Sequence, residues 1–218
     1  FIVKYYKTNP TFLTYGGINL PKDKNKSLNK EKSKIINSHN VLFIGRLEKD
    51  TGFLSYIKAL KILKTKYNRR ITMIVCGDGN LKSIAKKYVK TYNLSVEFKG
   101  FVSDLDKYYG ESDIILSSSY LSILEALYKR KIVISTYQNK LKNDYLKLSP
   151  FSKYIFICEN PHKIAHIIDD IHRNKRKYSI QSEAGEKFAK KRTWDETYKL
   201  YKDLWKINAN KALYVSEE

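Results

Sequence analysis

Cysteine is scarce in this sequence, with two residues among 218. Cys76 and Cys158 lie in separate apolar runs and lack the CxxC spacing that is typical of a zinc site. A single pair also cannot form the disulfide framework of a small secreted protein. We therefore interpret both as small buried hydrophobic residues of a protein from a reducing compartment.

Long apolar runs are absent as well. None approaches the ~20 residues that a transmembrane helix needs, and no secretory signal is visible. The sequence therefore favours a cytoplasmic location. The first residue is Phe1 rather than Met, so we expect the chain to be a fragment of a longer protein.

Acidic residues are few relative to basic ones. Asp and Glu number 22 against 42 Lys and Arg, which gives a formal net charge of +20. This excess predicts an anionic partner: a phosphate-bearing ligand, a nucleic acid or anionic lipid. Peripheral association of the protein with the inner face of the membrane is therefore one of the alternatives. The alternative is that most lysines solvate helix faces. Hydrophobic residues make up 42% of the chain, which excludes overall disorder.

From residue 41 onward, short apolar runs alternate with segments of helical periodicity. The runs are rich in β-branched residues, and they predict strands at 41–45, 71–77, 96–100, 113–118, 131–136 and 154–159. Runs of this length that alternate with helices are typical of a parallel, doubly wound α/β sheet whose strands are buried on both faces. We therefore predict a Rossmann-like fold.

The chain divides into three parts. Residues 1–38 are predicted to be an interdomain junction with a strand at 1–6, a glycine-rich turn at 15–19 and a charged linker at 22–38. Residues 39–175 form the Rossmann-like domain, and residues 176–218 form C-terminal helices. The last helix carries two apolar stripes, and we expect it to contact both this domain and a missing one. The stripes are Trp194, Tyr198, Tyr201 and Trp205, and Leu200, Leu204 and Ile207.

Glycine and polar residues gather where the predicted strands end. These segments are Gly45-Arg46, Gly77-Asp78-Gly79, Gly100-Phe101-Val102 and residues 117–122. Glycine lets backbone amides approach a phosphate, a helix N-terminus favours an anion, and arginine can form two hydrogen bonds to a diphosphate. Each glycine alone is more simply a turn residue, so their ordered recurrence is the observation that predicts a phosphate site.

Glu125 and a histidine pair are further candidates. Glu125 lies in a largely apolar helical segment, where a carboxylate either faces a solvent-filled cleft and ligand hydroxyls or is simply an exposed first-turn residue. His162 and His166 have the spacing of metal ligands on one helix, but no third ligand lies close in sequence, and we predict no metal site.

Taken in order, these segments resemble the C-terminal half of the retaining glycosyltransferases of family four, which have the GT-B fold. The resembling segments are YGGIN (15–19), VLFIGRLEKDTG (41–52), VCGDGNL (75–81), VEFKGFVSDLDKYY (96–109) and DIILSS…YLSILEAL (113–127), with the late helices from Phe188 to Trp205. They extend over most of the chain.

The resemblance implies a donor-binding half that takes a nucleoside diphosphate sugar without a metal or other cofactor. It implies transfer of a hexose to a glycan or lipid-linked acceptor of the cell envelope, together with a missing N-terminal domain. It assigns the diphosphate to Gly45, Arg46, Lys49, Thr51, Tyr120, Leu121 and Ser122. It assigns the ribose and base to Gly77, Gly100, Phe101, Val102 and Glu125. No catalytic base can be named in this half.

Two positions depart from the family. The family usually has a lysine immediately before the glycine that follows its Gly-Arg-Leu segment; here that residue is Thr51, and Lys49 is a possible substitute. The family also commonly has two glutamates eight positions apart; here Glu125 is the second, and Ser117 occupies the position of the first. These departures keep open a non-catalytic nucleotide-binding or scaffold domain. A basic nucleic-acid-binding module is a further alternative, but the lysines are scattered and no nucleic-acid motif occurs. The sugar, base, acceptor and oligomeric state are not specified.

Overall fold

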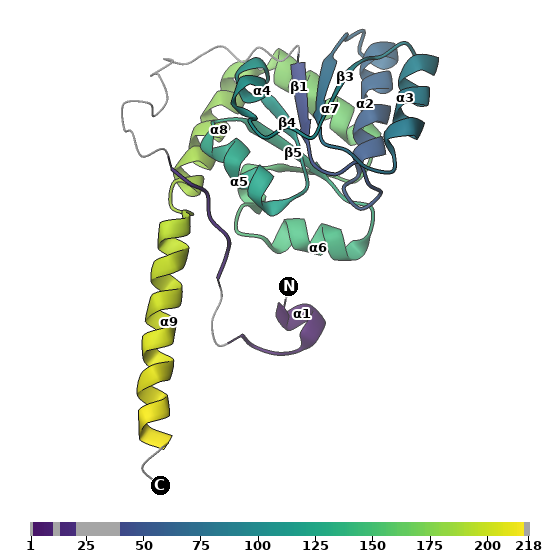
Figure 1. The fold of residues 1–218 in the computed structure, drawn as a ribbon. Helices are drawn as coiled ribbons and strands as arrows, with labels where there is room; N and C mark the ends of the chain where they lie inside the picture. Colours follow the sequence, from purple (N-terminus) through teal and green to yellow (C-terminus); the bar gives the residue numbers. More distant parts are fainter. Residues whose placement is uncertain (1, 11–13, 21–39, 216–218) are drawn as a thin grey trace.

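The computed structural model describes residues 2–10, 14–20 and 40–215, with side chains as far as Lys206. Six strands form one parallel sheet in the order β3-β2-β1-β4-β5-β6, which confirms the Rossmann-like α/β fold (Figure 1). The strands are β1 (Asn40–Ile44), β2 (Thr72–Cys76), β3 (Ser95–Gly100), β4 (Ile114–Leu116), β5 (Ile132–Thr136) and β6 (Phe156–Cys158). The predicted linker at 22–38 lies outside the described residues.

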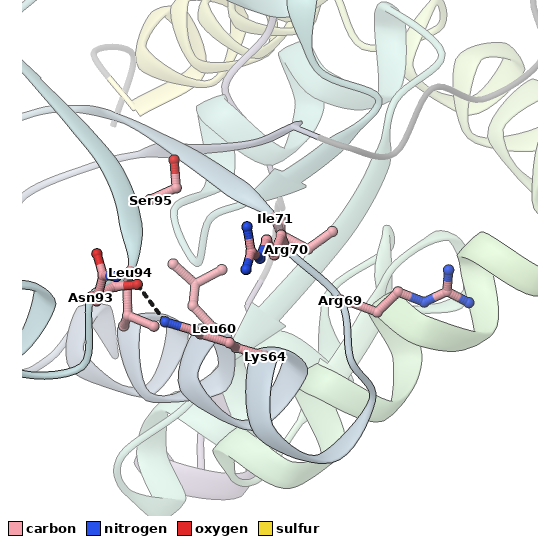
Figure 2. Close-up of a pocket in the computed structure, with 8 residues that line it drawn as sticks. All are labelled: Leu60, Lys64, Arg69, Arg70, Ile71, Asn93, Leu94 and Ser95. Carbon is pink, nitrogen blue, oxygen red and sulfur yellow. Dashed lines mark hydrogen bonds between the residues drawn. The ribbon is translucent and has the colours of Figure 1, made fainter.

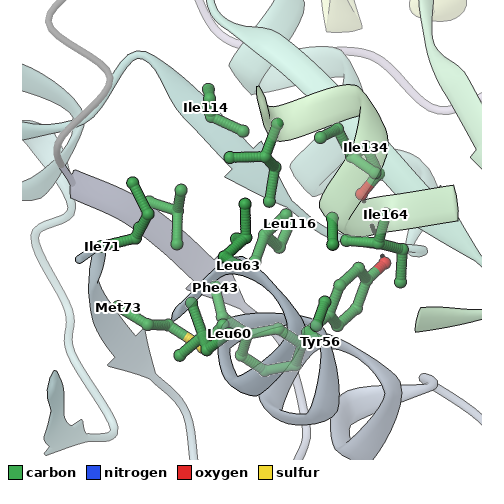
Figure 3. Close-up of a cluster of buried hydrophobic side chains, with 14 of the residues drawn as sticks. Phe43, Tyr56, Leu60, Leu63, Ile71, Met73, Ile114, Leu116, Ile134 and Ile164 are labelled. Atoms are coloured by element: carbon green, nitrogen blue, oxygen red, sulfur yellow. Dashed lines mark hydrogen bonds between the residues drawn. The ribbon is translucent and has the colours of Figure 1, made fainter. Parts of the chain in front are cut away.

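Alternation along the central strands divides the core between the two sheet faces. In β1, Val41 and Phe43 belong to one buried cluster, whereas Leu42 and Ile44 belong to the other, because successive side chains point to opposite faces. The first cluster is covered by α2 (Phe53–Lys66), α3 (Lys82–Thr91) and α7 (Pro161–Arg173) (Figure 3). The second is covered by α4 (Asp106–Glu111), α5 (Tyr120–Tyr128) and α8 (Lys175–Ala189).

β3 departs from the predicted burial on both faces. Along Ser95–Gly100, exposed residues alternate with half-buried ones. The reason is that β3 is an edge strand, which pairs only with β2 in the described sheet. Both cysteines are buried in the core without a disulfide, which confirms their interpretation as small apolar residues.

The predicted N-terminal strand is wrong. Residues Ile2–Tyr6 form a short helix, α1, and the residue that follows it, Lys7, has a positive φ of 56°. A strand needs a neighbour for its hydrogen bonds, and α1 instead contacts the sheet domain through side chains. Lys4 Nζ and Tyr5 Oη both donate to the carboxylate of Asp144, at 2.5 Å each.

Two elements between β5 and β6 escaped the sequence analysis. They are α6 (Lys140–Leu148) and a 3-10 turn at Ser152–Tyr154. The side chain of Asn139 caps α6, since its Oδ1 accepts the Lys142 N–H at 2.8 Å. The available signal was this Asn, followed by apolar residues at 141, 145, 146 and 148.

The last helix, α9 (Trp194–Val215), extends away from the sheet (Figure 1). Its first turn meets residues 15–19, because Ile18 N donates to Arg192 O and Trp194 N donates to Ile18 O. The predicted aromatic stripe is exposed at Trp194, Tyr198, Tyr201 and Trp205, while Ile207 lies beyond the described side chains. The expected contact of this helix with a partner domain stays a prediction. In the part of the chain that is described, no helix is long and apolar enough to span a bilayer.

Candidate functional site

The candidate site lies where the strand order reverses. β1 pairs with β2 on one side and with β4 on the other, so the connections after β1 and β4 leave the sheet in opposite directions. Ligands of doubly wound sheets bind in the crevice that this divergence opens at the carboxyl ends of the strands. The segments at this edge are residues 45–52 after β1 and residues 117–119 after β4.

The loops after β1 and β2 are packed backbone to backbone. A Cβ on Gly77 would lie 1.9 Å from Gly45 O, and Gly77 has a φ of +150°. Leu47 N donates to Asp78 O at 2.9 Å, and Leu81 N donates to Leu47 O at 2.9 Å. Because Gly77 has no side chain, the loop after β2 can pack closely against the loop after β1. This packing explains the glycine at position 77 without any contact to a ligand.

Arg46 follows the carboxyl end of β1, and its side chain is 70% exposed. Its guanidinium donates to Asp50 Oδ2 at 2.8 Å. Thr51 has a different role, because its hydroxyl donates to Arg46 O at 2.9 Å and to Glu48 O at 2.8 Å. These bonds close the loop. Lys49 is exposed on the same loop. Among the predicted diphosphate residues of this loop, Arg46 and Lys49 carry exposed cationic side chains, and their contact with an anion stays a prediction.

The two helices that begin at this edge lack side-chain caps. Gly52 precedes α2 and Ser119 precedes α5, and neither makes a side-chain capping hydrogen bond. The first amides of such helices are available to an anion, which the helix dipole also favours. The hydroxyl of Tyr120 donates to Gly16 O at 3.0 Å, so this side chain is already used in a contact with residues 15–19. Leu121 and Ser122 complete the first turn of α5.

The predicted ribose and base residues lie along the neighbouring β3–α4 connection and α5. Phe101 is 90% exposed, Val102 is partly buried, and Gly100 has a φ of +73° with open space at its Cβ position. Glu125 is half-buried, and burial raises the pKa of its carboxyl, a shift that Lys129 opposes and Asp106 reinforces. Beside it, the hydroxyl of Tyr109 is buried without a hydrogen-bond partner among the described residues.

Sequence reasoning missed one cation at this edge, Lys142 in the first turn of α6. Its side chain is partly buried, and its Nζ lies 4.5 Å from the centre of the Tyr145 ring. Burial lowers the pKa of the Lys142 ammonium; Asp50 opposes this shift and Arg46 adds to it. Lys142 therefore shares one electrostatic environment with the loop after β1, although almost a hundred residues separate them in sequence.

A hollow of about 370 Å³ lies at the opposite edge of the sheet (Figure 2). Lys64, Arg69, Arg70 and Asn93 contribute to its lining, and Lys64 Nζ donates to Asn93 O at 2.7 Å. Because it adjoins the amino ends of β2 and β3, we assign it no part in the candidate site. His162 and His166 are exposed on α7, and the described residues contain no cluster of three or more metal-ligating side chains.

Residues 21–188 match the family described as glycosyl transferases group 1, which is more than half of the chain. The chain belongs to this family. This match confirms the resemblance drawn from the motifs of this group 1 glycosyltransferase chain. The retaining stereochemistry and the individual site residues stay predictions.

Two curated relatives show how this group 1 chain compares in extent. It is 28% identical over 109 residues to the Campylobacter jejuni GalNAc-α-(1→4)-GalNAc-α-(1→3)-diNAcBac-PP-undecaprenol α-1,4-N-acetyl-D-galactosaminyltransferase, covering 47% of this chain and 30% of that protein. It is also 28% identical over 214 residues to an uncharacterised glycosyltransferase of Methanocaldococcus jannaschii, covering 91% of this chain and 53% of that protein. The chain thus spans about half or less of the relatives it matches.

Solved structures support the same fold for this group 1 chain. The C-terminal domain of a group 1 glycosyltransferase from Francisella tularensis aligns with a TM-score of 0.57 and 21% identity, covering 70% of this chain and 85% of that one. HepE of Anabaena, in complex with UDP, aligns with a TM-score of 0.63 and 17% identity, covering 80% of this chain and 49% of that one. These similarities establish the GT-B half-fold and leave the ligand of this chain to be tested.

Proposed function

We propose that this chain is the donor-binding half of a hexosyltransferase, which binds a nucleoside diphosphate sugar at the switch point of its sheet. The observation that carries the proposal is that the exposed Arg46 and the uncapped first turns of α2 and α5 all follow the carboxyl ends of the adjacent strands β1 and β4. A cation and two helix N-termini are the groups that bind a diphosphate. The Anabaena relative in fold is bound to UDP, which makes UDP the first nucleotide to test.

The same groups supply the chemistry of transfer. When the acceptor hydroxyl oxygen bonds to the anomeric carbon, the bond from that carbon to the diphosphate breaks and its electron pair goes to the leaving oxygen. The proton of the acceptor hydroxyl passes to the leaving diphosphate. Arg46 and the amides of the first turn of α5 would stabilise that developing charge, and donors fixed in place before the reaction are the most effective. Glu125 would accept hydrogen bonds from the ribose hydroxyls, and the exposed Phe101 and partly buried Val102 would face the base.

The acceptor belongs to the whole protein, of which this chain is one part. The Campylobacter relative acts on an undecaprenol-linked glycan, and this supports a glycan or lipid-linked acceptor here. Thr51 and the buried Ser117 carry no charge, and they favour the second candidate, a nucleotide-binding domain without transferase activity. Donor hydrolysis by the full-length protein separates the two, because only an enzyme releases the sugar.

The test is calorimetric titration of this chain with UDP, GDP and ADP. We expect one nucleotide to bind and Arg46→Ala to weaken it roughly 10- to 150-fold, which corresponds to the loss of a charged hydrogen bond worth about 1.5–3 kcal/mol. Arg70→Ala is the matched control, because Arg70 is an exposed arginine at the other edge of the sheet. Failure of all three nucleotides to bind, or equal losses in both variants, would overturn the proposal.

A further inference from the structure

The loop after β1 supplies less positive charge to the candidate diphosphate site than its sequence suggests. The guanidinium of Arg46 is paired with Asp50, and the Thr51 hydroxyl is used within the loop. A diphosphate would therefore meet one arginine whose charge is already offset. Lys49 is a second cation of this loop, but Glu48 and Asp50 offset the charges of Arg46 and Lys49, so net positive charge must come from another element that reaches this edge.

α6 is that element, because its contacts tie it to the first turns of both α2 and α5. Gln138, just before α6, donates through Nε2 to Ser55 Oγ at 3.1 Å in the first turn of α2. The ring of Tyr145 packs against Phe151, with 6.4 Å between ring centroids, and Phe151 packs against the ring of Tyr120, the first residue of α5, at 5.7 Å. Figure 1 shows α6 beside the end of the sheet. α6 thus connects the two helix N-termini of the site.

Lys142 lies on the face of α6 that carries Tyr145, since residues three apart share a face. Its Nζ is 4.5 Å from the centre of that ring, and its side chain is partly buried. Among the described residues, no carboxylate lies within ion-pairing distance of Lys142 Nζ. The Tyr145 ring gives the partly buried ammonium a cation–π contact but no opposite charge in direct contact, and an anionic ligand would supply that charge.

We propose that Lys142 is the second cation of the donor site, and that its ammonium binds the diphosphate of the nucleotide sugar together with Arg46. This inference rests on the function proposed above. Lys142 would then also face the negative charge that the leaving diphosphate gains during transfer. The site would be composed of residues from three connections at the carboxyl edge, those after β1, β4 and β5.

The experiment compares the chain with its Lys142→Met, Lys142→Arg and Lys147→Met variants. Lys147 is the matched control, because it is an exposed lysine at the other end of α6. Each protein is titrated by calorimetry with the nucleoside diphosphate that the unaltered chain binds, and by NMR with the corresponding nucleoside. Thermal unfolding of each variant establishes that it is folded.

We expect Lys142→Met to weaken diphosphate binding by about 10-fold or more, with nucleoside binding unchanged. Lys142→Arg should retain most of the affinity, and Lys147→Met should match the unaltered chain. Unchanged diphosphate binding by Lys142→Met, or an equal loss for the nucleoside, overturns the role of Lys142 while the donor site stands. Absence of nucleotide binding by the unaltered chain overturns the donor site itself.

Discussion

Arg46 and Asp50 form an ion pair within the loop after β1, with 2.8 Å between a guanidinium nitrogen and Asp50 Oδ2. Both side chains are mostly exposed, at 70% and 60%. An exposed pair of this kind contributes at most about 1 kcal/mol to the free energy of unfolding, so the pair has little effect on stability. Its consequence is electrostatic, because Asp50 places a negative charge beside the cation that would bind the donor.

Asp50→Asn should therefore strengthen binding of the nucleoside diphosphate. Removal of the carboxylate ends its repulsion of the diphosphate and frees Arg46, and we expect a gain of roughly threefold or more in affinity at low salt. Calorimetric titration measures the change. Asp203→Asn is the control, because it removes the same charge from an exposed position on α9. Weaker binding by Asp50→Asn would instead show that Asp50 orients Arg46 for the ligand.

Two glycines at different places should respond oppositely to alanine. Gly77→Ala would place a Cβ 1.9 Å from Gly45 O at a φ of +150°, so we expect a loss of more than about 2 kcal/mol in the free energy of unfolding. Gly110 lies in α4 with nothing within 4 Å of its Cβ position. Gly110→Ala should stabilise the protein by about 0.5–1 kcal/mol. Urea unfolding measures both, and similar stabilities for the two variants would contradict the packing described for Gly77.

Glu125→Gln should stabilise the chain and weaken its nucleotide binding. Burial raises the pKa of Glu125 in the folded state, so the folded protein holds this proton more tightly than the unfolded chain does. The contribution of Glu125 to stability therefore falls as the pH rises from the ordinary pKa of 4.5 through the raised value. The variant should unfold at a higher temperature than the unaltered chain at pH 7, and the difference should vanish in acid.

Nucleotide titration of the same variant tests the ligand role of Glu125. An amide is a weaker acceptor than a carboxylate for the ribose hydroxyls, so binding should weaken at pH 7 while stability rises. Glu183→Gln provides the control, since Glu183 is an exposed residue on α8. A loss of stability together with a loss of binding would identify Glu125 as a structural residue.

The sequence predicted the sheet because its strands are local patterns. The run at 41–45 is apolar throughout, and the structure buries β1 on both faces. The prediction of a strand at 1–6 failed, because residues 2–6 have no partner strand in the part of the chain that is described and form α1. The helix α6 was also missed, since only one residue, Asn139, signals the start of this short, lysine-rich helix.

The sequence by itself determined the six strands of the sheet and the residue types at their ends, because periodicity and glycine placement depend on near neighbours. Only the tertiary structure decided what those residues contact. It assigned the Thr51 hydroxyl to the closing of its own loop and the Tyr120 hydroxyl to Gly16. It also brought Lys142 into the environment of Arg46, since packing between distant segments depends on the shapes and charges of both partners.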